Sequence, residues 1–91
     1  MLKFEWDPTK AESNVKKHGV TFEQAATVFG DPLALTFPDP DGSKGEARHL
    51  TFGLAQSGKL TVVSHTERRG TIRIISARAA TRHERKIYEQ G

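Results

Sequence analysis

The sequence predicts an α+β domain in which a small, mainly antiparallel β-sheet has its helices packed on one face. Two helical segments occur early in the chain, and each begins with a helix-capping pattern. After them, the spacing of the apolar residues changes from helical to alternating, as expected for strands. The last strand-like segments are joined by short links, which exclude the long crossovers that parallel neighbours need. Together these observations predict the element order β-α-α-β-β-β-β-α.

The first third of the chain is expected to form one strand and two helices. Residues 2–6 alternate in hydropathy and predict a strand. Asp7-Pro8 provides an N-cap and a proline at the first helical position, and Gly19 ends this first helix. Thr21 begins a short second helix, because a glutamine follows it three residues later as in a capping box. The second helix is expected to pack through an apolar stripe made of Phe22, Ala25, Ala26 and Phe29.

The rest of the chain is expected to form four strands and a final helix. The predicted strands are residues 33–37, 48–54, 60–67 and 71–78. A polar loop over residues 38–45 separates the first two of these strands. Gly58 and Gly70 each end a three-residue link, which is typical of hairpins that place glycine in the left-handed conformation. A capping box at Thr81 begins the last helix, which runs to Gln90.

Length and composition limit the class of protein. The 91 residues suffice for one domain, and we expect residues 1–91 to form it. No apolar run approaches the ~20 residues that cross a bilayer, and the N-terminus lacks the long apolar stretch of a signal peptide. Without cysteine the chain has no disulfide framework and no thiolate chemistry. We therefore expect a cytoplasmic protein that does not associate with membranes.

The two halves of the chain differ in charge. Residues 1–45 carry five Lys and seven Asp or Glu, a net charge of −2, whereas residues 46–91 carry two Lys, seven Arg and four Glu, a net charge of +5. Every arginine lies in the second half. The planar fork of arginine binds phosphates and carboxylates through two hydrogen bonds. The bias favours phosphate recognition, and the alternative interpretation is an ordinary solvated basic surface.

The two predicted hairpin turns set the register of the last three strands. Across the first turn His49 faces His65, and across the second turn His65 faces Arg73. Glu67 then lies diagonally beside His65. These four side chains are expected to form a row on the open face of the sheet. The opposite face is expected to form the core under the two early helices, and it collects Leu50, Phe52, Leu54, Leu60, Val62, Ile72 and Ile74.

Histidine, glutamate and arginine on one open face are the groups that metal-independent RNA cleavage requires. A base takes the proton of the 2′-hydroxyl, an acid protonates the departing 5′-oxygen, and cations stabilise the crowded phosphorane. His65 and Glu67 are the candidate acid–base pair, in either order, and Arg73 is the candidate phosphate clamp. Cross-strand ion pairing on a solvated face explains the same residues equally well. Zinc bound by His49, His65 and Glu67 is less favoured, because the adjacent arginine would repel the metal.

Other polar residues have a structural and a functional interpretation. Arg78 ends its strand on the core side, from where it is expected to reach around the sheet edge toward an anion. Arg82, Arg85 and Tyr88 on the last helix either line an RNA groove or keep a short helix soluble. Arg68 lies in a turn, where it is exposed unless a partner covers it. We expect no metal and no cofactor, since the proposed chemistry uses side chains alone.

The chain also resembles a known family over nearly its whole length. In the first half the resemblance rests on Phe4-Glu5-Trp6-Asp7, Lys10, Asn14, Lys17-His18-Gly19-Val20, Phe22, Ala25, Val28-Phe29 and Asp31-Pro32. In the second half it rests on His65-Thr66-Glu67-Arg68, Arg73-Ile74-Ile75-Ser76-Ala77-Arg78, Ala80, Glu84-Arg85 and Tyr88. These residues resemble the BrnT toxins of bacterial type II toxin–antitoxin systems.

The resemblance implies a compact RelE-like endoribonuclease that cleaves cellular RNA and arrests growth. It also implies neutralisation by a BrnA-like antitoxin, whose ribbon-helix-helix domain binds operator DNA and lets the complex repress its own operon. The matched residues in the basic half are His65, Glu67, Arg68, Arg73 and Arg78. His49 has no place in the family pattern, so its inclusion rests on register alone.

Two sets of site residues are therefore expected. The expected catalytic residues are His65, Glu67, Arg73 and Arg78. The expected RNA-binding residues are Arg68, His49, Arg82, Arg85 and Tyr88. The competing interpretation is a non-catalytic module that binds RNA or a regulatory partner through the same basic face.

Overall fold

The protein is described by a computed structural model that covers residues 2–40 and 47–91. Its strands are β1 (Lys3–Glu5), β2 (Leu35–Pro38), β3 (His49–Leu54), β4 (Leu60–Arg68) and β5 (Thr71–Ala79). Its helices are α1 (Pro8–His18), α2 (Phe22–Thr27) and α3 (Arg82–Gln90), and a short 3-10 helix, η1 (Val28–Gly30), continues α2. The predicted α+β class and element order are confirmed. Residues 41–46 of the predicted polar loop lie outside the described residues.

The strands of the described residues form one sheet in the order β1-β5-β4-β3-β2. The strands from β2 to β5 pair antiparallel with their neighbours, but β1 pairs parallel with β5. The sheet is therefore mixed, although it is mainly antiparallel as predicted. A parallel pair is possible because the long connection through the helices lets the chain return to β5 in the direction of β1.

The helix ends confirm the capping patterns seen in the sequence. The Asp7 side chain caps α1 with a hydrogen bond of 2.8 Å, and Gly19 ends α1 in the left-handed conformation with φ 70°. Thr21 caps α2 with a hydrogen bond of 3.1 Å. Thr81 and Glu84 form a reciprocal capping box at the start of α3. None of the helices in the described part of the chain is long and apolar enough to cross a membrane.

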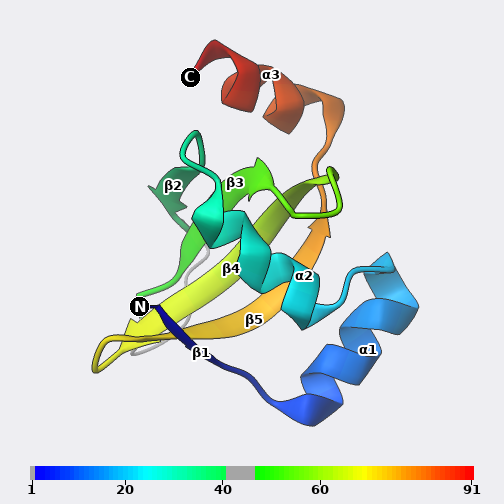
Figure 1. Ribbon diagram of the computed structural model, residues 1–91, viewed down its shortest axis with the longest axis vertical. Helices are drawn as coiled ribbons and strands as arrows, with labels where there is room; N and C mark the ends of the chain where they lie inside the picture. Colours follow the sequence, from blue (N-terminus) through cyan, green and yellow to red (C-terminus); the bar gives the residue numbers. More distant parts are fainter. Residues whose placement is uncertain (1, 41–46) are drawn as a thin grey trace.

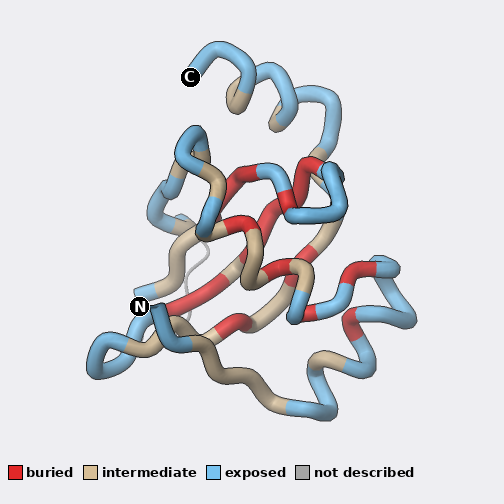
Figure 2. The backbone as a smooth tube through the Cα atoms, viewed as in Figure 1, coloured by how far each residue is buried: buried red, intermediate tan, exposed pale blue. Residues whose placement is uncertain are grey.

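The helices and the sheet form two layers around one core. In Figure 1, α2 crosses in front of β4 and β5, α1 lies beside β5, and α3 stands at one end of the sheet, near β3. Figure 2 shows that buried residues concentrate in the central strands and in the segments that face them. The buried core consists of Val20, Phe22, Ala25, Val28, Ala55, Val63, Ile74 and Ala77.

Asn14 joins α1 to the edge of β5 beyond the point where β1 ends. This side chain is buried, with 5% exposed. Its amide group donates to the carbonyl of Ala77 at 2.8 Å and to that of Val20 at 2.9 Å, and its oxygen accepts from the N–H of Ala77 at 3.0 Å. Asn14 thereby satisfies the backbone groups of Ala77 as a neighbouring strand would.

The β3–β4 hairpin has the predicted register. His49 lies opposite His65, and Leu54 lies opposite Leu60. Gly58 closes the three-residue link with φ 89°, a left-handed conformation that glycine adopts without strain. The glycine at the end of this link therefore predicted both the turn and the pairing of the strands.

The β4–β5 hairpin differs from the prediction. Arg69 and Gly70 both have positive φ, at 51° and 80°, so the link consists of two residues rather than three. A β-bulge between Ser64 and His65 then shifts the register again farther along the strands. A turn with a non-glycine residue in the left-handed conformation is uncommon, and no residue pattern indicated the bulge.

The changed register breaks the predicted row of side chains. His65 lies opposite Ile74 instead of Arg73, and Arg73 lies opposite Thr66. Paired residues share a face and successive residues alternate, so His65 and Arg73 occupy opposite faces of the sheet.

We call the two sides of the sheet the helix face and the outer face. The helix face lies under α2 and carries Thr51, Val63, His65, Ile74 and Ala77. The outer face carries Leu35, Phe37, Leu50, Phe52, Val62, Ser64, Thr66, Arg73, Ser76 and Arg78. The predicted core face is buried in part, since Phe52, Leu60, Val62 and Ile74 are buried, but its expected cover by the two early helices was wrong. Of its members only Ile72 and Ile74 lie on the helix face, because Val62 and Val63 are both buried and the alternation did not distinguish the two faces.

Candidate active site

His65 lies beneath the helical layer and not on an open face. Only 8% of the residue is exposed. The ring of Phe29 packs edge-on against its imidazole at 4.9 Å between centroids, and His49 stacks on it at 5.9 Å. Nε2 of His65 is hydrogen-bonded to the Thr51 hydroxyl at 2.7 Å, and this hydroxyl meets that of Thr36 at 2.8 Å. Nδ1 is buried and has no hydrogen-bond partner.

These surroundings keep the imidazole of His65 neutral. Burial, with a smaller contribution from His49, lowers the pKa of His65 from 6.5 to about 4. A general acid or base must reach the substrate and needs a pKa near the working pH. His65 meets neither condition, so the predicted position of this residue on an open face is wrong and we leave it out of the candidate site.

Glu67 and Arg68 are exposed at the end of β4. Glu67 lies opposite Ile72 and so shares the helix face with His65, two residues away. The structure therefore brings His49, His65 and Glu67 to one face, as predicted, but leaves Arg73 on the other. Residues 2–40 and 47–91 contain no cluster of three or more side chains that could hold a metal ion, so the zinc site considered from the sequence is not formed.

Arg73 lies on the outer face beside a carboxylate from the first strand. Its Nη1 atom donates to Oε2 of Glu5 at 2.8 Å. Both side chains are partly exposed, at 31% for Arg73 and 42% for Glu5. Arg73 thus pairs with Glu5 from β1, whereas the sequence predicted it opposite His65 of β4.

Arg78 forms a second ion pair on the same strand and the same face. Its Nη1 and Nη2 atoms donate to Oε1 and Oε2 of Glu84 at 2.6 and 2.8 Å. The hydrogen bond from Arg78 lowers the pKa of Glu84 to about 2, despite the opposing effect of burial. The same hydrogen bond raises the pKa of Arg78. Arg78 does reach an anion, as expected, but this anion is a carboxylate of α3.

The three residues of helix α3 that were predicted to bind RNA differ in their surroundings. Arg82 and Arg85 are exposed. The hydroxyl of Tyr88 donates to Oδ2 of Asp31 at 2.6 Å, so Tyr88 docks α3 on the segment after η1. Burial raises the pKa of Asp31, but hydrogen bonds from the Leu54 backbone and the Tyr88 hydroxyl outweigh it, and the net pKa is lowered.

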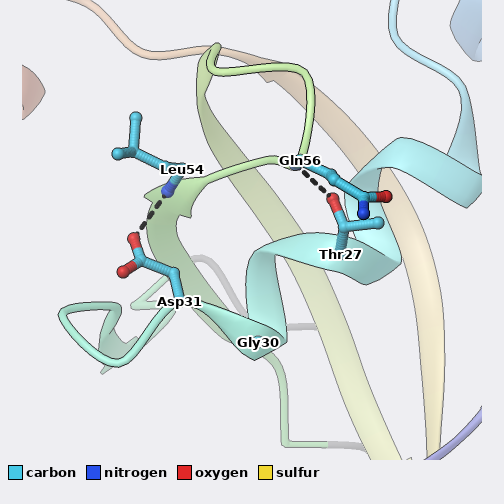
Figure 3. Close-up of a pocket in the computed structure, with 5 residues that line it drawn as sticks. All are labelled: Thr27, Gly30, Asp31, Leu54 and Gln56. Carbon is cyan, nitrogen blue, oxygen red and sulfur yellow. Dashed lines mark hydrogen bonds between the residues drawn. The ribbon is translucent and has the colours of Figure 1, made fainter.

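A cavity of about 400 Å³ opens between η1 and the β3–β4 hairpin. It is lined by Thr27, Gly30, Asp31, Leu54 and Gln56. In Figure 3 the Asp31 carboxylate accepts from the Leu54 backbone, and the Thr27 hydroxyl accepts from the Gln56 backbone, each at 2.8 Å. These bonds tie the hairpin to the helical layer. Among the described residues, the lining of this cavity includes no arginine, so we do not place an RNA-binding site there.

The two carboxylates that pair with the arginines were not among the predicted site residues. Glu5 was overlooked because the register argument covered only the last three strands, and β1 joins the sheet through a parallel pair. Glu84 was recognised only as a capping residue. An arginine at the end of the preceding strand, six residues before that glutamate, was the available signal for the second pair.

Two arginines paired with carboxylates project from one face of the sheet in this small α+β protein. Over residues 6–84 the chain matches the family described as ribonuclease toxin, BrnT, of type II toxin–antitoxin systems. The chain therefore belongs to the BrnT family of ribonuclease toxins. No curated protein matches it.

The fold is similar to a solved structure of this family, the 1.1 Å crystal structure of the Brucella abortus ribonuclease toxin BrnT. The TM-score is 0.68 at 22% sequence identity, over 90% of this chain and all of the Brucella chain. Family membership makes the protein a ribonuclease toxin that acts on RNA and has an antitoxin partner. Of the two functions weighed from the sequence, the enzyme is therefore the correct one.

Proposed function

We propose that the RNA substrate lies along β5 on the outer face, with its phosphates bound by Arg73 and Arg78. The observation that carries this proposal is that both arginines project from one strand on one face and are partly exposed, at 31% and 39%. Their Cα atoms are roughly 16 Å apart at ~3.3 Å per residue. Ser64 and Ser76, which pair across β4 and β5 between the two arginines, offer hydroxyl groups along the path.

Cleavage proceeds through the 2′-hydroxyl of the RNA and uses no metal ion. The Glu5 carboxylate takes the proton of the 2′-hydroxyl, the 2′-oxygen bonds to phosphorus, and the bond from phosphorus to the 5′-oxygen breaks. The 5′-oxygen takes a proton from solvent. Arg73, whose guanidinium lies 2.8 Å from Glu5, stabilises the negative charge of the phosphorane.

Glu67 is the second candidate for the general base. It is exposed at the end of β4 and close in sequence to Arg68. It lies on the helix face, however, whereas Arg73 and Arg78 lie on the outer face. A base on the outer face beside Arg73 reaches the phosphate that Arg73 binds, and this favours Glu5.

The mechanism is tested by RNA cleavage in excess chelator, with the product ends determined. We expect 2′,3′-cyclic phosphate and 5′-hydroxyl ends, and we expect a single 2′-deoxy substitution at the cleavage site to block the reaction. Glu5→Gln should lower the cleavage rate by roughly 10²-fold, and the matched variant Glu67→Gln should leave it within about twofold. Products with 5′-phosphate ends would rule out this chemistry, and the reverse order of the two variants would make Glu67 the base.

The antitoxin is proposed to be a BrnA-like protein with a ribbon-helix-helix domain, which carries the complex to operator DNA. The family supports an antitoxin, and the net charge of +5 in residues 46–91 favours a partner with an acidic surface that covers the outer face. We place the protein in the cytoplasm, where cellular RNA is available. Co-expression with the neighbouring small gene should relieve growth arrest, and a neighbour that neither relieves arrest nor co-purifies would contradict the proposal.

A further inference from the structure

The contact between Arg78 and Glu84 occupies one edge of the guanidinium group and leaves another edge open. Nη1 and Nη2 each donate one hydrogen bond to the Glu84 carboxylate, at 2.6 and 2.8 Å. Nη1 also lies 3.4 Å from the carbonyl oxygen of Ala79. Because arginine has five N–H donors, the N–H of Nε and the second N–H of Nη2 remain. These two donors point in the same direction and form a second fork of the kind that binds phosphate.

Glu84 is itself held firmly in place. Its backbone N–H donates to the Thr81 hydroxyl at 3.2 Å, and its Oε1 accepts from the Thr81 N–H at 2.9 Å. Only 15% of its side chain is exposed, against 39% for Arg78. The capping box therefore fixes the carboxylate at the start of α3, and the carboxylate fixes the plane of the guanidinium.

We propose that Glu84 is a positioning residue that orients Arg78, so that the open Nε–Nη2 edge binds an RNA phosphate beyond the cleaved one and keeps the RNA aligned with Glu5 and Arg73. This inference rests on the proposed function, in which Arg78 binds a phosphate. Glu84 does not touch the RNA, and it acts only through Arg78. The competing possibility is that the carboxylate imitates a phosphate and must leave before RNA binds.

The two possibilities predict opposite effects of Glu84→Gln. Glutamine at this position preserves the volume and the capping box, but it cannot accept both hydrogen bonds from Arg78. If Glu84 positions Arg78, kcat should fall about tenfold or more, because RNA that is misaligned at Arg78 is also misplaced at Glu5 and Arg73. The Kd for an uncleavable 2′-deoxy RNA should change less than about threefold. If Glu84 competes with RNA, KM and Kd should fall instead, without loss of kcat.

The experiment is a double-mutant cycle with Glu84→Gln, Arg78→Ala and the double variant, in which kcat, KM and Kd are measured. Glu89→Gln is the matched control, because it removes the same charge from an exposed site on the same helix. Thermal melts of all variants verify that they fold. We expect Glu84→Gln to have no further effect on kcat once Arg78 is replaced, because a residue that acts through Arg78 has nothing left to position.

Four results would overturn the inference. Lower KM and Kd with unchanged kcat in Glu84→Gln would make the carboxylate a competitor of RNA. A loss of kcat that persists at full size in the Arg78→Ala background would show that Glu84 acts independently of Arg78. If Arg78→Ala lowers kcat and Glu84→Gln does not, the positioning role is wrong while the proposed function stands. An unchanged kcat in Arg78→Ala itself would remove the proposed role of Arg78, and this inference with it.

Discussion

The sequence predicted a catalytic role for His65, whereas the structure places this side chain in a buried, structural position. In the sequence it is a histidine beside a glutamate in a basic segment, which favours acid–base chemistry. In the structure it packs against Phe29 and His49, with 8% of its surface exposed and one hydrogen bond to Thr51. Its neutral form contributes to the stability of the fold, so the free energy of unfolding should depend on pH.

Stability should decrease as the pH falls from about 6.5 to about 4. The pKa of His65 is about 4 in the folded state, and its ordinary value of 6.5 applies to the unfolded chain. Above pH 6.5 the imidazole is neutral in both states, and its contribution is fully present. Between the two values the unfolded chain binds a proton that the folded chain does not, so the free energy of unfolding decreases by about 2 kcal/mol between pH 7 and pH 5.

The control for this prediction is His65→Gln, which removes the titrating group and leaves the other three histidines in place. Urea denaturation at pH 7 and pH 5 should show a smaller pH effect for this variant than for the original protein, even though the variant is less stable at pH 7. Equal pH effects in both proteins would mean that His65 is not held neutral.

At the scale of the elements, the β3–β4 hairpin was predictable and the β4–β5 hairpin was not. A glycine at the end of a three-residue link specified the first register, and the structure has that register. The link between β4 and β5 also has three polar residues ending in glycine. However, Arg69 adopts a positive φ and the turn consists of only two residues. Propensity alone disfavours arginine in this conformation. Two-residue turns with positive φ at both positions nevertheless match the twist of the flanking strands, and this favours them in hairpins.

The close approach of β3 to η1 gives a prediction about packing. A Cβ atom added at Gly53 would lie 2.8 Å from Cγ1 of Val28 and 3.1 Å from Cβ of Ala34. Val28 is completely buried and has no room to move. Gly53→Ala should therefore lower the free energy of unfolding by about 1–3 kcal/mol through overpacking.

Gly30→Ala is the matched control, because a Cβ atom at that position would meet no atom within 4 Å. Thermal or urea denaturation of the two variants should show a clear loss for Gly53→Ala and a change within about 0.5 kcal/mol for Gly30→Ala. Equal stability of the two variants would show that η1 yields easily and that the contact is not tight.

At the scale of the whole molecule, the fold class and the family could be predicted, and the arrangement of the site could not. Capping residues and glycine stops lie within single segments, so they specified the helices and their order. The face that each side chain occupies depends on a bulge at Ser64 and on the parallel pair between β1 and β5, both of which are long-range features. For this reason Arg73 was predicted to lie opposite His65, whereas it lies opposite Thr66 and pairs with Glu5.

The two faces of the sheet have different roles in the molecule. The helix face carries the buried core and His65, which together maintain the fold. The outer face carries Arg73 and Arg78 with their carboxylate partners, and we propose that it binds and cleaves RNA. Replacing an arginine of the outer face should therefore affect cleavage and leave the core unchanged.

The most direct test of this account measures RNA cleavage and thermal stability together for Arg73→Gln, with Lys17→Gln as the control for loss of one exposed positive charge. Lys17 is exposed on α1. We predict that Arg73→Gln lowers the single-turnover cleavage rate by roughly 10²-fold and changes the free energy of unfolding by less than about 1 kcal/mol. Lys17→Gln should leave both nearly unchanged. Cleavage at the original rate by folded Arg73→Gln would contradict the account.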